Sequence, residues 1–295
     1  MPLRDPPPFG ARMLPADTFA GQVVYVTGGG TGLGKAMALE FARCGADVAI
    51  ASRDEGHRAA GVAAMQALGA RALGTAVDVR EPESIAHSFD EVEAGLGPIS
   101  ILINNAAGNF AAPAERMSAN AWRSVINIVL NGTYFCAAEF ARRRIARKEG
   151  GAILNIGATY SWTGGPVAAH SAAAKAGVTN LTQTLAVEWA PDDIRVNCLA
   201  PGLFPARDRS EHAVGMMATQ PRGGETIPAQ RVGEPRELGW AATYMCSPYA
   251  AYLTGHTMVL DGGNWLRRYG FGMPEFEVVR DRFDRLSAAR AETAE

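Results

Sequence analysis

Short runs of apolar residues recur along the chain, and longer segments with apolar positions three and four apart separate them. Runs that stay apolar, instead of alternating with polar residues, are typical of strands that helices cover on both faces. The runs predict seven strands, at residues 23–26, 48–51, 72–77, 101–103, 152–156, 196–200 and 257–260.

The segments between the runs predict helices. Most of them are rich in alanine, and they span residues 33–43, 57–68, 84–94, 121–147 and 172–189. A spacing of about 25 residues or more between strands leaves room for one crossover helix each time. We therefore predict an α/β fold, a Rossmann-type doubly wound parallel sheet of about seven strands with helices on both faces.

The domain organisation follows from the same pattern. We expect one domain over residues 1–295, with a core at 20–264. An irregular stretch that contains glycine and proline, residues 201–233, interrupts the pattern, and a long insertion of this kind is usually a functional lid. Residues 270–295 have apolar and charged positions at helical spacing and predict an appended C-terminal helix.

Composition narrows the function classes. The 295 residues carry 28 Lys and Arg against 30 Asp and Glu, a net charge of −2, so nothing favours binding to nucleic acid. No window approaches 18 uninterrupted apolar residues, and the start of the chain has no apolar signal-peptide region, so we expect neither a membrane span nor secretion. Four widely spaced cysteines, three of them with apolar neighbours, predict buried reduced thiols, and cytoplasm is the expected compartment.

A glycine cluster follows the first predicted strand directly and leads into the first helix. Backbone amides at such a helix start can face a pyrophosphate, and a Cβ atom there would block its approach. The strand before and the helix after favour a dinucleotide site over a plain tight turn. Its candidate residues are Thr27, Gly28, Gly30, Thr31, Gly32, Leu33 and Gly34.

The end of the second strand indicates which dinucleotide binds. Sites that prefer NAD place an acidic residue here on the ribose 2′-hydroxyl, whereas this chain has Arg53. A guanidinium can pair with a 2′-phosphate, which favours NADPH. Two other interpretations stay open: Asp54 turns back to a hydroxyl, or Arg53 is a solvated charge at a strand end.

These motifs together resemble the short-chain dehydrogenase/reductase superfamily over residues 20–264. The matching positions are the glycine cluster, Asp78, the stretch Asn104-Asn105-Ala106-Ala107-Gly108, Lys175 and Pro201-Gly202. The resemblance implies that Asp78 and Val79 hold the adenine and that Lys175 bonds the nicotinamide ribose. It also implies cofactor contacts by Asn105, Ala106, Gly108, Pro201, Gly202, Leu203 and Phe204.

The usual catalytic set of that superfamily is incomplete here. Its tyrosine stands four residues before the lysine, where its phenol pKa is lowered for proton transfer to an alcohol or carbonyl. This chain has Ser171 at that position, Ala158 where a serine is expected and Val129 where an asparagine is expected. Of the four residues only Lys175 is present.

A different tyrosine, Tyr160, lies 15 residues before Lys175 and just past the fifth strand. The Tyr160 to Lys175 spacing resembles the 2,4-dienoyl-CoA reductase branch, as do the segments Asn104-Asn105-Ala106-Ala107-Gly108-Asn109-Phe110, Asn120-Ala121-Trp122, Ile128-Val129-Leu130-Asn131-Gly132-Thr133 and Ala186-Val187-Glu188-Trp189. That branch shifts its tyrosine in this manner. The departure from it is residues 204–230, whose register does not align.

The branch implies roles for individual residues. Tyr160 and the Asn109 amide would bond a thioester oxygen and stabilise a dienolate, with Lys175 orienting the ribose and keeping the local field positive. Phe110, Ser118 and Ser171 match the substrate side of the site, and Arg80 matches a position that meets CoA phosphates. From the residues alone, Ser118 is equally a helix N-cap and Arg80 equally a solvated charge.

The resulting expectation is NADPH-dependent reduction of a 2,4-dienoyl-CoA to a 3-enoyl-CoA in fatty-acid or related acyl-CoA degradation. A carbonyl or alcohol oxidoreductase with Tyr160 as acid is one alternative, and a non-enzymatic NADP(H)-binding regulator is another. The scattered histidines predict no metal site. By analogy with the superfamily, the helices at 121–147 and 172–189 are expected to pair between subunits of a homotetramer.

Overall fold

The computed structural model describes residues 3–205, 224–266 and Arg285. Seven parallel strands form one sheet in the order β3-β2-β1-β4-β5-β6-β7. Their bounds are β1 Val23–Thr27, β2 Asp47–Ser52, β3 Ala72–Ala76, β4 Ile99–Asn104, β5 Gly151–Ile156, β6 Ile194–Pro201 and β7 Thr257–Leu260. Each predicted strand is therefore present, with its ends displaced by two residues at most. The predicted fold class is confirmed.

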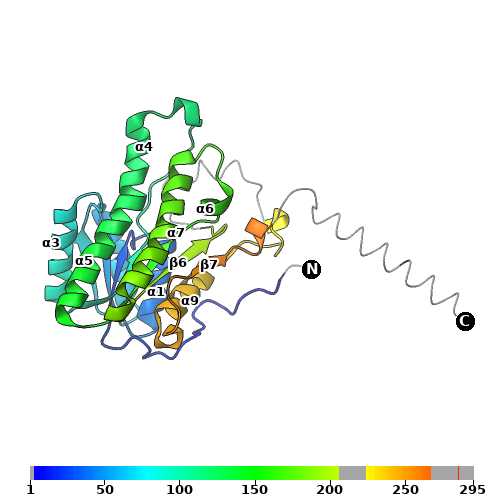
Figure 1. Cartoon of the computed structure of the whole chain (residues 1–295). Helices are drawn as coiled ribbons and strands as arrows, with labels where there is room; N and C mark the ends of the chain where they lie inside the picture. Colours follow the sequence, from blue (N-terminus) through cyan, green and yellow to red (C-terminus); the bar gives the residue numbers. More distant parts are fainter. Residues whose placement is uncertain (1–2, 206–223, 267–284, 286–295) are drawn as a thin grey trace, which may run out of the picture.

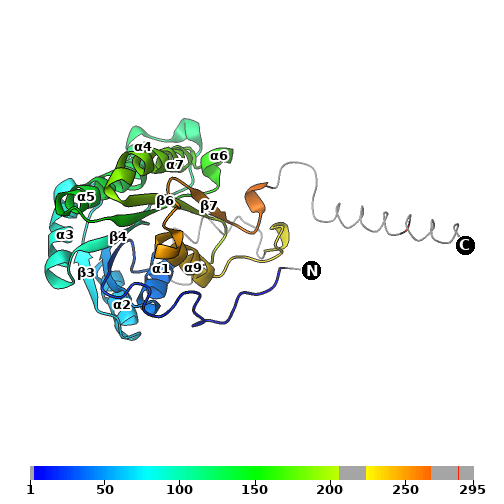
Figure 2. The ribbon, with the colours of Figure 1, turned by 60° about the horizontal axis from the view of Figure 1, so that its bottom comes forward.

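Helices cover both faces of the sheet (Figure 1). On one face lie α1 (Gly32–Arg43), α2 (Glu55–Gln66) and α9 (Pro235–Cys246); on the other lie α3 (Pro82–Gly95), α5 (Gly132–Arg147) and α7 (Ala169–Trp189), as Figure 2 shows. Each face has its own apolar core: Met37, Phe41, Met65, Leu238 and Met245 pack on the first, and Ile85, Phe89, Phe140, Leu185 and Trp189 on the second. Burial on both faces explains why the strands read as continuous apolar runs.

Sheet order places the site. Because β1 pairs with both β2 and β4, the chain leaves the sheet in opposite directions from two adjacent strands. In open α/β sheets, ligands bind at such a switch point, outside the carboxyl ends of the strands. The loops after β1 and β4 therefore border the expected binding crevice.

The predicted helix over 121–147 is present, but it contains a π-helical turn that the sequence pattern does not predict. The segment divides into α4 (Ala119–Ile126), a π-helical turn (Asn127–Asn131) and α5. Within and beside the turn, the Asn131 amide donates to Asn127 Oδ1 at 2.9 Å and the Thr133 hydroxyl donates to the Val129 carbonyl at 2.7 Å. The wider turn changes the helical phase, a shift that apolar periodicity does not reveal.

Helix starts account for two of the candidate polar residues. Asp54 caps α2 through a 2.7 Å bond from the His57 amide, and Ser118 caps α4 through a 3.1 Å bond from the Ala121 amide. In each case the side-chain oxygen accepts a hydrogen bond from a backbone amide of the first helical turn, which has no partner within the helix.

Three further points concern the rest of the chain. A short helix, α6 (Tyr160–Thr163), lies between β5 and α7. The predicted C-terminal helix at 270–295 lies outside the described residues except for Arg285, and so does most of the irregular stretch 201–233, at 206–223. Among the described residues, no helix is long and apolar enough to cross a membrane.

Candidate active site

The loop between β1 and α1 depends on glycine for its shape. Gly28 and Gly32 have φ angles of +64° and +55°, in the left-handed region that glycine adopts without strain. A Cβ atom on Gly34 would lie 2.3 Å from the Gly28 carbonyl oxygen, and one on Gly30 would lie 2.5 Å from the His57 carbonyl oxygen. The loop is therefore held close to its neighbours, and its amides remain available at the start of α1.

Hydrogen bonds tie this loop to the loop after β4. The Thr27 hydroxyl accepts bonds from the Asn105 and Ala106 amides, each at 3.0 Å. In return, the Asn105 side-chain amide donates to the carbonyls of Thr27 and Gly28, at 3.0 and 3.1 Å. Thr27 and Asn105, both predicted to bind the cofactor, thus hold the two walls of the crevice together.

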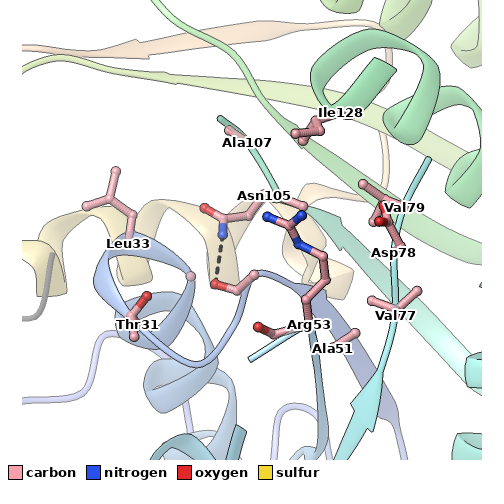
Figure 3. Close-up of a pocket in the computed structure, with 14 residues that line it drawn as sticks. Thr31, Leu33, Ala51, Arg53, Val77, Asp78, Val79, Asn105, Ala107 and Ile128 are labelled. Atoms are coloured by element: carbon pink, nitrogen blue, oxygen red, sulfur yellow. Dashed lines mark hydrogen bonds between the residues drawn. The ribbon is translucent and has the colours of Figure 1, made fainter. Parts of the chain in front are cut away.

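A groove with a volume of about 370 Å³ runs along the carboxyl ends of β1, β2 and β3 (Figure 3). It brings together residues predicted from separate motifs: Gly28, Thr31, Leu33, Gly34, Arg53, Asp78, Val79, Asn105 and Ala106. Ile128, from the π-helical turn, also lines it and was missed, because the sequence pattern predicts an unbroken helix there.

Two neighbouring charged residues follow β2, and one of them, Arg53, lines the groove. Arg53 extends into the groove between Asn105 and Asp78 in Figure 3. Asp54 uses its carboxylate to cap α2. The Asp54 carboxylate is therefore engaged as a helix cap, and Arg53 is an exposed cation that lines the groove.

Arg80 lies beside the groove and binds Asp78. Its Nε donates to both carboxylate oxygens, at 2.8 and 3.0 Å, and a terminal nitrogen donates to Oδ2. Hydrogen bonding by Arg80 is the largest cause that lowers the pKa of Asp78, and Arg53 lowers this pKa further by its charge. The carboxylate is therefore ionised and carries a bound counter-charge.

Tyr160 and Ser171 meet over the carboxyl edge of the sheet. Tyr160 begins α6, just past β5, and its hydroxyl lies 3.0 Å from the Ser171 Oγ in α7. Either oxygen can be the donor. The residue at the superfamily's usual tyrosine position thus contacts the hydroxyl of the displaced tyrosine.

Lys175 lies one helical turn beyond Ser171 and is buried, with 7% of its surface exposed. Its Nζ donates to the Ile156 carbonyl, at the end of β5. Desolvation by burial lowers the pKa of this ammonium to about 8. The Lys175 amine therefore lies at the edge of the sheet with a pKa close to physiological pH, so that it is mostly charged but loses its proton readily.

Asn109 and Phe110 follow β4. The Asn109 side-chain oxygen accepts a 2.9 Å bond from the Phe110 amide, which directs the oxygen to the backbone. The Phe110 ring meets His170 edge-on, with ring centroids 4.5 Å apart and planes at 88°.

His170 is a site residue that the sequence reasoning missed. It is fully buried, and its Nδ1 accepts a 2.7 Å bond from the Ser171 amide. Burial lowers the pKa of this imidazole, so the neutral form is favoured. Its position next to Ser171 in the sequence could have pointed to it, but only the spacing between histidines was considered.

The remaining candidates take up varied positions. Pro201 ends β6, and Gly202 donates to the Leu260 carbonyl at 2.9 Å, so this segment borders the same edge. Phe204 is buried in the core on the α1 side.

Comparison with known proteins agrees with this architecture. The family model described as enoyl-(acyl carrier protein) reductase matches residues 28–264. A short-chain dehydrogenase from Bacillus anthracis has a similar solved structure, at 42% identity and a TM-score of 0.76, over 85% of this chain and 99% of that one. The chain belongs to the short-chain dehydrogenase/reductase family and is an oxidoreductase of that family.

Several relatives carry more specific names. A probable 2,4-dienoyl-CoA reductase [(2E)-enoyl-CoA-producing] of Bacillus subtilis is 39% identical over 85% of this chain and 99% of its own length. A peroxisomal 2,4-dienoyl-CoA reductase [(3E)-enoyl-CoA-producing] of Danio rerio is 38% identical over 85% of this chain and 83% of its own length. A solved structure named citronellol catabolism dehydrogenase, from Pseudomonas aeruginosa, is also similar, at 32% identity, a TM-score of 0.76 and 86% and 99% coverage. The predicted resemblance to the dienoyl-CoA reductase branch is confirmed.

The burial of Lys175 predicts a pH dependence of stability. An amine with a pKa of about 8 when folded binds fewer protons than the unfolded chain, whose lysine has its ordinary pKa of 10.5. The free energy of unfolding should therefore rise with pH between these values, relative to a Lys175→Met variant, by about 2 to 3 kcal/mol. Urea unfolding of both proteins without ligand, at pH 7 and pH 10, measures this; parallel changes in both would contradict it.

Proposed function

We propose that this protein catalyses the NADPH-dependent reduction of a 2,4-dienoyl-CoA to a 3-enoyl-CoA. The observation that carries the proposal is the 3.0 Å contact between Tyr160 and Ser171, formed one helical turn from the buried Lys175. Alcohol chemistry in this family uses a tyrosine at the position of Ser171, with a serine and an asparagine where this chain has Ala158 and Val129. Reduction of a conjugated thioester does not need this full set of residues, because the negative charge that arrives with the hydride spreads onto the thioester oxygen.

The groove suits a phosphorylated dinucleotide. Close-packed glycines free the amides at the start of α1 for a pyrophosphate, and Arg53 supplies a cation where a 2′-phosphate would lie. When bound, NADPH supplies the hydride, which adds to the δ carbon of the dienoyl group. Lys175 would orient the nicotinamide ribose through its Nζ and keep the local field positive.

Tyr160 would act on the thioester oxygen. As hydride arrives at the δ carbon, charge develops on that oxygen, and hydrogen bonds from the Tyr160 hydroxyl and the Asn109 side-chain amide would stabilise the dienolate. With its hydroxyl 3.0 Å from Tyr160, Ser171 can accept the tyrosine hydrogen or donate its own. A proton from water then reaches the α carbon, where the dienolate carries much of its charge, and gives the 3-enoyl-CoA.

Deleting the Tyr160 hydroxyl tests this role. Tyr160→Phe should lower kcat on the order of 100-fold, the scale of one lost oxyanion donor. Ser171→Ala should cost far less, because the Tyr160 hydroxyl remains to donate to the thioester oxygen. Stopped-flow oxidation of NADPH with a 2,4-dienoyl-CoA measures both, and Tyr244→Phe, a tyrosine of α9 on the other face of the sheet, is the matched control.

The same experiment separates the alternatives. A panel of dienoyl, enoyl and 3-oxoacyl thioesters and ketones should show the dienoyl thioester turning over fastest. A faster ketone would favour a carbonyl reductase with Tyr160 as acid, and tight NADPH binding without any turnover would favour a non-enzymatic regulator. Product analysis by mass and NMR should give the 3-enoyl ester. A 2-enoyl product would show protonation at the γ carbon, and a 4-enoyl product would contradict the site of hydride addition.

Arg53 should set the choice of dinucleotide. We expect NADPH to bind more tightly than NADH, and an Arg53→Asp variant to reverse the order, because a carboxylate repels the 2′-phosphate and accepts a bond from a 2′-hydroxyl. Fluorescence titration of each dinucleotide measures both dissociation constants. Equal affinities in the wild-type protein would contradict the expectation.

Assembly is the last part of the proposal. Exposed aromatic and aliphatic side chains on the helices expected to pair between subunits include Trp122, Tyr134 and Val187. A homotetramer would bury them. Light scattering should then give four times the 31.2 kDa of one chain; a monomer would remove the proposal.

A further inference from the structure

The groove contains an acidic residue, Asp78, beside Arg53, the side chain proposed to meet a 2′-phosphate (Figure 3). Among the described residues that line the groove, Arg53 and Asp78 are the charged ones. Taken alone, the two charges cancel. A carboxylate in this position would repel a phosphate monoester, which carries about −1.5 to −2 charges at pH 7, and it would also compete for Arg53, whose field it already feels.

Arg80 removes this conflict. The Arg80 guanidinium donates hydrogen bonds to both carboxylate oxygens of Asp78, and the Arg80 backbone amide donates to Oδ1 at 3.1 Å. The Asp78 amide in turn donates to the Ser84 hydroxyl at 3.0 Å, so both ends of the residue are held. Because Arg80 balances the charge of Asp78, the positive charge of Arg53 remains available to bind an anion in the groove.

We infer that Arg80 is a specificity-determining residue for the dinucleotide: by pairing with Asp78 it makes the adenosine end of the groove net positive and so permits a 2′-phosphate. It is a positioning residue and acts through Asp78, not by its own contact with the ligand. The inference rests on the proposed use of NADPH and goes beyond it. It also differs from the role that the family resemblance implies for Arg80, contact with CoA phosphates.

The test is a comparison of two affinities. Arg80→Ala should weaken NADPH binding about tenfold and leave NADH binding within about twofold, since only the 2′-phosphate meets the exposed carboxylate and exposed charges are partly screened. A merely structural role would weaken both dinucleotides alike. Arg80→Lys should retain part of the wild-type NADPH-to-NADH affinity ratio, because it keeps the charge but not the side-on geometry.

Removal of the carboxylate provides the second arm. In the Arg80→Ala background, Asp78→Asn should recover the NADPH-to-NADH ratio, because no uncompensated charge remains. Arg71→Ala is the matched control: Arg71 pairs with Asp47 at 2.8 Å, at the opposite, amino end of β2. It should change neither affinity.

The outcomes are distinct. Equal binding of NADPH and NADH by the wild-type protein would overturn the proposed cofactor, and with it this inference. A wild-type preference that survives in Arg80→Ala would overturn the inference alone. A raised KM for the CoA thioester with an unchanged dinucleotide ratio would also overturn it, in favour of the CoA contact.

Discussion

The close contact between the loops after β1 and β4 supports the rest of the site. These two loops diverge from adjacent strands, and nothing in the sheet's own hydrogen bonding holds them together beyond the strand ends. The Thr27 hydroxyl and the Asn105 amide supply that link, and the absence of a side chain on Gly34 leaves room for it. With the loops fixed, one wall presents the amides of α1 and the other carries the chain on to Asn109 and Phe110.

A second constraint is the low polarity around Lys175. Its ammonium is buried in the first turns of α7, with the Ile156 carbonyl as acceptor. Burial makes its charge expensive and shifts its pKa toward neutrality, which makes the amine responsive to what binds beside it. Tyr160 reaches the same edge from α6 through Ser171, so the displaced tyrosine and the retained lysine are supported by one helix.

Charge in the groove is balanced by residues that follow different strands. Arg53 leaves β2, Asp78 leaves β3, and Arg80 follows two residues later, yet the three form one electrostatic unit. Asp54 stands next to Arg53 in the sequence but belongs to the cap of α2. Neighbours in sequence therefore serve different structures here, while residues from separate strands act together.

The sequence by itself determined the architecture. Continuous apolar runs separated by helical periodicity are enough to specify a parallel sheet covered on both faces, and the strand, glycine cluster and helix specify where a dinucleotide site begins. The resemblance to the reductase branch also grouped Tyr160, Ser171 and Lys175. The structure brings Tyr160 and Ser171 into contact, because the segment that contains all three residues folds locally as α6 and α7.

Only the tertiary structure decided the rest. The π-helical turn at Asn127–Asn131 depends on side-chain bonds that periodicity does not encode, and through it Ile128 reaches the groove. His170 becomes significant only when its ring is packed against Phe110, which comes from β4. Likewise, the pairing of Arg80 with Asp78 is a matter of side-chain direction, which the sequence pattern does not specify. Packing determines which side chains meet across the sheet edge and which hydrogen-bond partner each one takes, and the pattern of residues along the chain does not contain this information.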